Sequence, residues 1–141
     1  MELVLFGEDY LRFKHFLEKG QILFLTAEVR PRWNREGGEL ELKVINMMPL
    51  AELMDKNTRQ VELGLELPCI TADFTERMKQ ICSKYALTKK EAGSKGSSVN
   101  FHVEDRKSAI SLNMPLRIKV IPSEFIAAVK TGNFDIRISL K

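Results

Sequence analysis

Hydrophobic and polar positions recur along the chain with two different periods, and these periods predict alternating helices and strands. Glu2–Phe6 is a short apolar run that predicts a strand. Acidic Glu8 and Asp9 follow, where a helix dipole favours negative charge. Apolar side chains then recur every three or four positions, as in an amphipathic helix: Tyr10, Phe13, Phe16 and Leu17. Lys19 and Gly20 predict the end of that helix.

The next segment predicts a β-hairpin. Residues 21–30 are rich in strand-forming apolar side chains, and a polar loop over residues 31–38 ends in two glycines. Glu39–Met48 then alternates strictly, with Leu40, Leu42 and Val44 on one face and charged residues on the other. Two such runs joined by a glycine-containing loop are typical of an antiparallel hairpin.

The middle of the chain predicts a boundary followed by a strand and a helix. A helical turn over residues 49–54 leads into a polar stretch, 55–60, where we place the boundary. Residues 61–67 alternate again, as a half-buried strand does. Asp73 with Glu76 three positions later has the form of a capping box, and apolar residues at helical spacing extend to Tyr85.

The last third predicts a loop, a hairpin, a helix and a final strand. Thr88–Ser98 is small, polar and basic, which predicts a flexible surface loop. Residues 99–103 and 109–112 predict a second hairpin, and residues 116–121 a separate strand. We expect Ser123 to cap a helix that stops at Gly132, before a strand over residues 134–140. The fold class is therefore α+β.

Length and composition limit the number of compact units, and the two halves of the chain differ in net charge. The 141 residues are 44% hydrophobic, which suits one compact unit or two very small ones. The net charge is +3, yet residues 1–62 carry nine Lys/Arg against eleven Asp/Glu, and residues 63–141 carry thirteen against eight. A basic second half favours an acidic or polyanionic partner, although the same excess also serves solubility.

Localisation is expected to be cytoplasmic. No apolar run approaches the roughly 20 residues of a membrane span, and the first residues lack the basic flank of a secretory signal. Cys69 and Cys82 both stand among apolar residues, as small buried side chains do. We therefore expect no membrane association and no disulfide.

No pattern of residues predicts an active site or a bound cofactor. Neither glycine-rich phosphate-binding motif occurs, and neither His15 nor His102 has partners at metal-ligand spacing. Both histidines are expected to be structural. Cys82 falls on the apolar side of its helix, where a thiol is inert. We expect this chain to hold no metal or cofactor and to have no activity of its own.

The first hairpin is the strongest candidate for nucleic-acid binding. Four cations surround the chain's single tryptophan: the set is Arg30, Arg32, Trp33, Arg35 and Lys43. Cations neutralise phosphates, and an indole ring can stack on an unpaired base. The alternative is a purely structural loop, because nearby glutamates offset these charges and a tryptophan beside a turn often covers the end of a small core.

An ordered series of residues across the first half resembles a known module. It runs from Leu3-Val4-Leu5-Phe6-Gly7-Glu8-Asp9-Tyr10 through Phe13, Leu17 and Gly20 to Glu39-Leu40-Glu41-Leu42-Lys43-Val44 and Leu50. This series is similar to the OB-fold module near the carboxy terminus of the bacterial DNA polymerase III alpha subunit.

The second half resembles the terminal domain of the same family. The similar features are Val61–Leu67, the helix at 73–85, Gly96-x-x-Val99, Ile118-x-Val120 and Ser123-x-Phe125. In that family the terminal domain binds the tau subunit of the clamp loader. The resemblance thus implies a partner-binding surface within residues 106–141, tau as partner, and single-stranded DNA as a further ligand of the hairpin.

The resemblance also implies a division into domains. Residues 1–58 correspond to a partial OB-like antiparallel sheet with one helix, and residues 59–141 to a small mixed α/β terminal domain. The strands that precede Phe6 in the family are missing, so we expect an exposed sheet edge through which two copies could form a homodimer. The catalytic aspartates of the polymerase have no counterpart here.

The expected function is to tether a replicative DNA polymerase to its clamp loader during DNA replication. Nucleotidyl transfer would belong to the remainder of that DNA-directed DNA polymerase. The alternative is a free-standing OB-type nucleic-acid-binding module appended to another enzyme.

Overall fold

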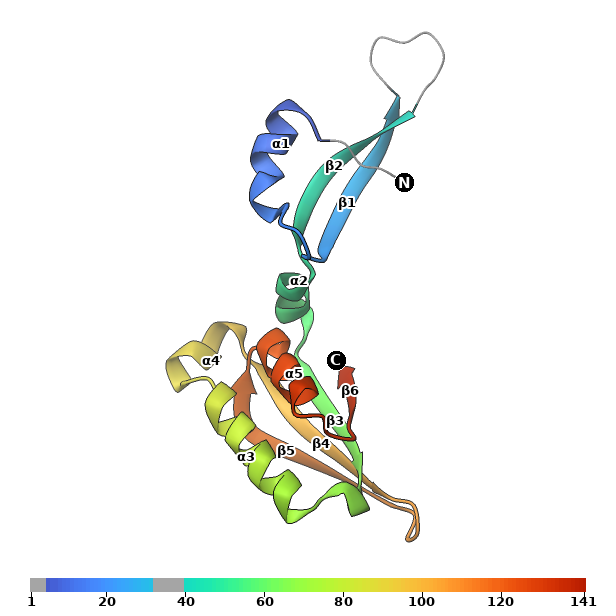
Figure 1. Ribbon diagram of the computed structural model, residues 1–141, viewed down its shortest axis with the longest axis vertical. Helices are drawn as coiled ribbons and strands as arrows, with labels where there is room; N and C mark the ends of the chain where they lie inside the picture. The colour runs from blue at the N-terminus through green and yellow to red at the C-terminus, as the bar shows by residue number, and fades with distance from the viewer. Residues whose placement is uncertain (1–4, 32–39) are drawn as a thin grey trace. The chain divides into compact units, whose positions relative to one another are not determined.

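A computed structural model describes residues 5–31 and 40–141, with the side chains of residues 94 and 95 excepted. The chain forms two compact units, unit 1 over Met1–Leu53 and unit 2 over Met54–Lys141 (Figure 1). This division falls within helix α2 (Leu50–Asn57), whereas the sequence-based boundary follows residue 58. The fold is α+β, as predicted: one antiparallel two-stranded sheet and one mixed four-stranded sheet.

Unit 1 contains a helix and a hairpin. Helix α1 (Gly7–Phe13) continues into a 3-10 turn, η1 (Lys14–Phe16), so the predicted helix to Lys19 is too long. Residues three apart lie in line on a 3-10 turn, and this tightening keeps both Phe13 and Phe16 against the same small core. The strand predicted at residues 2–6 lies largely outside the described residues.

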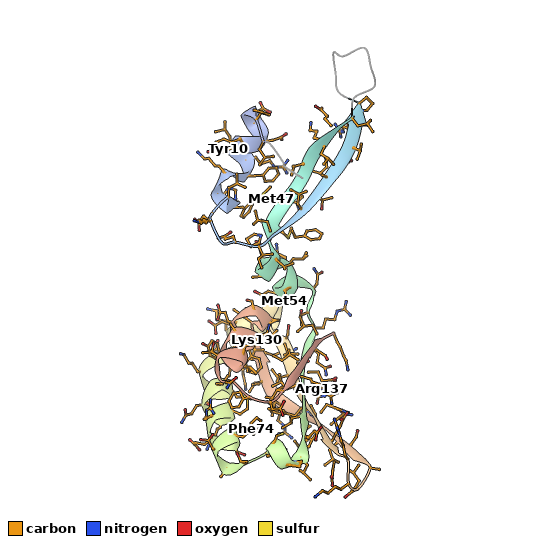
Figure 2. The ribbon with its side chains drawn as sticks, turned by 45° about the vertical axis from the view of Figure 1, so that its right-hand side comes forward. Tyr10, Met47, Met54, Phe74, Lys130 and Arg137 are labelled. Carbon is orange, nitrogen blue, oxygen red and sulfur yellow. The ribbon has the colours of Figure 1, made fainter. Side chains whose placement is uncertain are left out.

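The hairpin pairs β1 (Leu23–Pro31) with β2 (Leu40–Pro49), as predicted, but its alternation is interrupted. Thr26 pairs with Asn46 and Ala27 with Val44, which leaves Ile45 as a bulge. Because of the extra residue, Val44 and Met47 face the same side, and both are buried with Phe13. Figure 2 labels Met47 on the side of the hairpin that faces α1.

Unit 2 is built on a sheet with strand order β5-β4-β3-β6. Its strands are β3 (Gln60–Glu66), β4 (Ser97–Asp105), β5 (Ile110–Val120) and β6 (Arg137–Leu140). Strands β3 and β4 are parallel, so they need a crossover connection. That connection contains η2 (Leu67–Cys69), α3 (Ala72–Tyr85) and α4 (Lys89–Lys95). The other two pairings are antiparallel.

Helix α3 and helix α5 (Pro122–Thr131) cover the same face of this sheet (Figure 1). Strand β3 alternates between buried and half-buried residues, which confirms its predicted pattern. The core joins strand and helix side chains: Val61, Leu63, Leu65, Val99, Phe101, Val103, Val120, Met78, Phe125, Ile126 and Val129.

The loop predicted at residues 88–98 is wrong. Helix α4 occupies most of it, and β4 begins at Ser97. Thr88 and Glu91 form a capping box in which the Thr88 backbone N–H donates to Glu91 Oε2 at 3.1 Å and the Thr88 hydroxyl donates to it at 2.6 Å. This box offsets the weak helix propensity of the glycine and serine that follow.

The strands predicted at residues 109–112 and 116–121 are one strand, β5. It pairs with β4 from Asp105↔Ile110 to Ser97↔Val120, with an irregularity opposite Val99. Pro115 lies just before that irregularity and lacks a donor N–H. Strand β5 is an edge of the sheet, where a proline is tolerated.

Two predicted helix caps are also wrong. The N-cap of α3 is Thr71, whose hydroxyl accepts the Phe74 N–H at 3.1 Å, rather than Asp73. Helix α5 begins at Pro122 with Ile121 as N-cap, so Ser123 is the second helical residue. The final strand begins at Arg137 rather than at residue 134, after Asn133 adopts a φ of 51°.

Candidate interaction surfaces

The cationic hairpin is described only in part, because Arg32, Trp33 and Arg35 lie outside the described residues. Arg30 donates through Nε and Nη2 to Glu28 Oε2, at 3.0 and 2.5 Å. The register places Glu28 opposite Lys43 and Arg30 opposite Glu41. The described part of the hairpin therefore brings Arg30 and Lys43 together on one face, but each has a carboxylate beside or opposite it.

The open face of the unit 2 sheet carries a polar network around His102. Its Nδ1 is 2.8 Å from Asn113 Oδ1, and its Nε2 is 3.3 Å from Glu104 Oε1. Arg137 donates to the other Glu104 oxygen at 2.9 Å, and this contact lowers the pKa of Glu104. Each ring nitrogen of His102 thus has a polar partner within the sheet, as is usual for a structural histidine.

His15 lies against the Phe16 ring, with ring centroids 3.9 Å apart. Within the described ranges, no group of three or more His, Cys, Asp and Glu side chains is placed to hold a metal ion. Both cysteines are free thiols.

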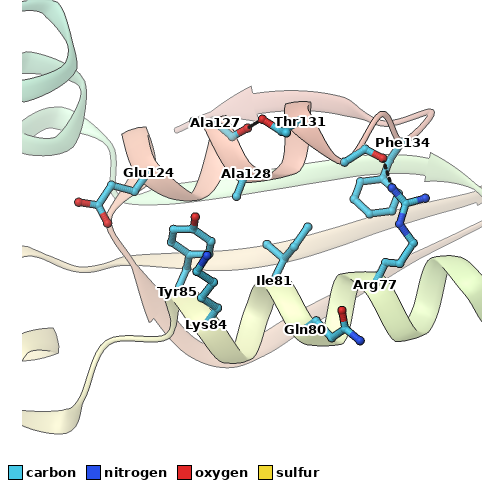
Figure 3. Close-up of a pocket in the computed structure, with 11 residues that line it drawn as sticks. Arg77, Gln80, Ile81, Lys84, Tyr85, Glu124, Ala127, Ala128, Thr131 and Phe134 are labelled. Atoms are coloured by element: carbon cyan, nitrogen blue, oxygen red, sulfur yellow. Dashed lines mark hydrogen bonds between the residues drawn. The ribbon is translucent and has the colours of Figure 1, made fainter.

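Helix α3 has a groove on each of its two flanks. On the α5 side lies the helix groove, a depression of about 680 Å³ (Figure 3). It is lined by Arg77, Gln80, Ile81, Lys84, Tyr85, Glu124, Ala127, Ala128, Thr131, Gly132 and Phe134. Arg77 closes one end, because it donates to the Gly132 carbonyl and its guanidinium lies over the Phe134 ring at 4.7 Å.

On the other flank, α3, β4 and β5 enclose the sheet groove, of about 360 Å³. Its apolar lining is Leu65, Ile70, Phe74, Met78, Cys82, Phe101, Val103, Met114, Leu116 and Ile118, and its polar lining is Thr75, Lys79 and Arg117. Ile70 and Met114 of this lining are 36% and 43% exposed, and Leu112, two residues before Met114 on β5, is 53% exposed. Apolar side chains left open to water in this way favour contact with another molecule.

The sheet groove includes residues of the predicted partner-binding stretch, 106–141, and also residues of α3, for which the sequence predicted only an amphipathic helix. Phe74, Met78 and Cys82 form one apolar stripe in the sequence, and periodicity alone does not tell a covered stripe from an open one. Desolvation raises the pKa of the Cys82 thiol. A thiol with a raised pKa holds less thiolate at neutral pH and therefore reacts slowly.

No protein-family model matches the chain, and no curated protein matches it. Among the described helices, none is long and apolar enough to cross a membrane.

Proposed function

We propose that this chain is the non-catalytic carboxy-terminal part of a bacterial replicative DNA polymerase, acting in the cytoplasm. Unit 2 binds the tau subunit of the clamp loader and so tethers the polymerase to it. Catalysis belongs to other parts of that polymerase, and affinity is the contribution of this chain.

The proposal rests on where the residues that carry the resemblance lie: those similar to the OB-fold module are in unit 1, and those similar to the terminal domain are in unit 2. Leu5–Tyr10, Glu41–Val44 and Leu50 all belong to unit 1, with its helix and hairpin. The features that resemble the tau-binding domain all belong to unit 2. A sequence that resembles two adjacent domains is expected to fold as two compact units with a division between them.

The sheet groove supports protein binding by unit 2. Protein interfaces have a core of apolar side chains with polar residues at the rim, and this groove has an apolar lining with two cations. A small domain that holds such a surface open is suited to docking a partner.

Unit 1 is proposed to lie near the template strand and to contact single-stranded DNA through Arg30, Arg32, Trp33, Arg35 and Lys43. The carboxylates beside Arg30 and opposite it weaken phosphate binding at the described end of the hairpin. We therefore assign the DNA contact a secondary role, with Trp33 as its main contributor through stacking.

The test is a titration of the full chain against purified tau and, separately, against labelled single-stranded DNA, each at low and moderate salt. We expect tau binding that weakens little with salt, and DNA binding that is weak, falls steeply with salt and loses about 1–3 kcal/mol in Trp33→Ala. Tight, salt-sensitive DNA binding without tau binding would overturn the tether and favour a free-standing nucleic-acid-binding module.

A further inference from the structure

The sheet groove is an apolar cavity beside the core of unit 2, in which Val61, Leu63 and Val99 are fully buried. Met78 of α3 lines one wall and is 4% exposed, whereas Met114 of β5 lines the other and is 43% exposed. One wall is thus covered by the protein's own packing and the other is open to solvent. Methionine side chains adapt readily to an incoming surface.

The charge of the groove indicates what it can accept. Two cations, Lys79 and Arg117, line it, and its described lining includes no carboxylate. Within the described part of the chain, neither cation forms an ion pair. Residues 63–141 carry thirteen Lys/Arg against eight Asp/Glu, so the surroundings favour a negatively charged partner and disfavour a second copy of this basic unit.

The two grooves beside α3 differ, and the differences favour the sheet groove as the docking site. Arg77 already fills one end of the helix groove by its contacts with Gly132 and Phe134, and Glu124 adds a negative charge there. The sheet groove has neither obstacle. Thr75 is its only other polar lining residue among those described. Apolar side chains can therefore enter the groove without leaving a charged group buried and unpaired.

We propose that the sheet groove binds a partner segment that inserts apolar side chains between Met78 and Met114 and places carboxylates beside Lys79 and Arg117. This inference rests on the proposed function, because we expect the segment to belong to tau. The contact is a small apolar core with a charged rim, which provides affinity through burial and orientation through the ion pairs.

The test compares the two cations of the sheet groove with Lys84, which lines the helix groove. In the full chain, Lys79→Glu combined with Arg117→Glu reverses the charge of the sheet groove and should raise the Kd for tau about tenfold, equivalent to about 1.4 kcal/mol. Lys84→Glu should leave the Kd within about twofold, because Lys84 lies outside the proposed contact. Circular dichroism checks that each variant is folded.

Cys82 provides a second measurement that leaves the groove charges intact. In a Cys69→Ser chain, Cys82 is the sole cysteine and lines the groove. Burial keeps this half-buried thiol slow to react with a maleimide, so its alkylation is followed at mildly alkaline pH, where more thiolate is present. Saturating tau should slow the alkylation further, by about tenfold, because an occupied groove excludes the reagent.

The outcomes separate the two proposals. If the unsubstituted chain does not bind tau, both the proposed function and this inference fall. If tau binds, but Cys82 is alkylated at the same rate with and without tau and the Lys79/Arg117 variant binds as well as Lys84→Glu, the sheet groove is not the docking site and the tether stands.

Discussion

The carboxylate of Asp55 binds the first turn of α5 through Ser123, 68 residues away in the sequence. Asp55 Oδ1 accepts the backbone N–H of Ser123 at 2.7 Å, and Oδ2 accepts its hydroxyl at 2.6 Å. The first N–H groups of a helix have no partner within the helix. Asp55 therefore acts as a cap from another element, and its negative charge lies at the favourable end of the α5 dipole.

Replacing Asp55 by alanine should lower the free energy of unfolding of unit 2 by about 1–2 kcal/mol, the usual cost of a lost cap. Urea unfolding followed by circular dichroism measures this loss. The exposed Glu76 is the control, and Glu76→Gln should cost less than about 0.5 kcal/mol. Equal losses for both variants would contradict the capping role.

This cap shows which parts of the fold the sequence alone could predict. Ser123 lies before an apolar helical pattern, so local rules assign it the capping role. The actual cap comes from a side chain 68 positions away, and no local pattern contains that information. Helix existence was predicted correctly for α3 and α5, while their first residues were not.

Gly96 and Gly93 make a matched pair for a packing prediction. A Cβ at Gly96 would lie 2.8 Å from Lys119 Cβ and 2.9 Å from Leu87 Cδ1, so the α4–β4 connection packs against β5 at a point where a methyl group does not fit. Gly96→Ala should therefore destabilise unit 2 by about 1–3 kcal/mol.

Gly93 lies within α4 and has nothing within 4 Å of its Cβ position. Gly93→Ala should be stabilising by about 0.5–1 kcal/mol, because alanine restricts the unfolded chain and favours the helix. Thermal and urea unfolding measure both variants. A neutral Gly96→Ala would mean that Lys119 and Leu87 move aside without cost.

The ion pair between Arg137 and Glu104 predicts a pH dependence. The hydrogen bond and charge of Arg137 lower the pKa of Glu104 below its ordinary value of 4.5, and His102 contributes in the same direction. A carboxylate with a lowered folded-state pKa stabilises the fold above its unfolded pKa, and this contribution is lost as pH falls through the folded value. Stability should thus decline below about pH 4.5 for this reason.

Arg137→Gln removes the main cause of the lowered pKa of Glu104. The variant should be less stable than the parent chain near neutral pH, and the difference should shrink as pH falls through the lowered pKa of Glu104, because the carboxylate then becomes protonated in both chains. Unfolding curves over this pH range provide the measurement. Lys130→Gln serves as the control, because Lys130 of α5 is exposed and forms no ion pair within the described residues. A difference that persists in acid would show that packing of Arg137, rather than the ion pair, is responsible.

The apolar face of the unit 1 hairpin predicts self-association. Val29 is 63% exposed and Leu40 is 68% exposed, and the register places Val29 opposite Leu42 on the same face. Such a face on a two-stranded sheet with open edges invites pairing with another copy. Sedimentation velocity should detect a dimer that Val29→Lys weakens by at least about tenfold. Thr26→Lys, on the opposite face, should not, and equal effects would contradict the assignment.

The hairpin also shows how a single residue limits prediction. The alternation of Leu40, Leu42 and Val44 correctly predicts β2, but the Ile45 bulge shifts the pattern so that Met47 is buried. A bulge depends on pairing with β1, which the pattern of one strand does not encode. In the same way, the sheet groove exists because α3 leaves part of β5 uncovered. The apolar stripe of α3 does not show how much of β5 the helix covers.

Amide hydrogen exchange on the full chain, with and without tau, tests most directly whether unit 2 docks tau. We predict slower exchange in α3 and β5, on either side of the sheet groove, with unchanged exchange in β1 and β2 of unit 1. Protection confined to the hairpin, or no protection in unit 2 at saturating tau, would contradict the claim that unit 2 is the docking domain.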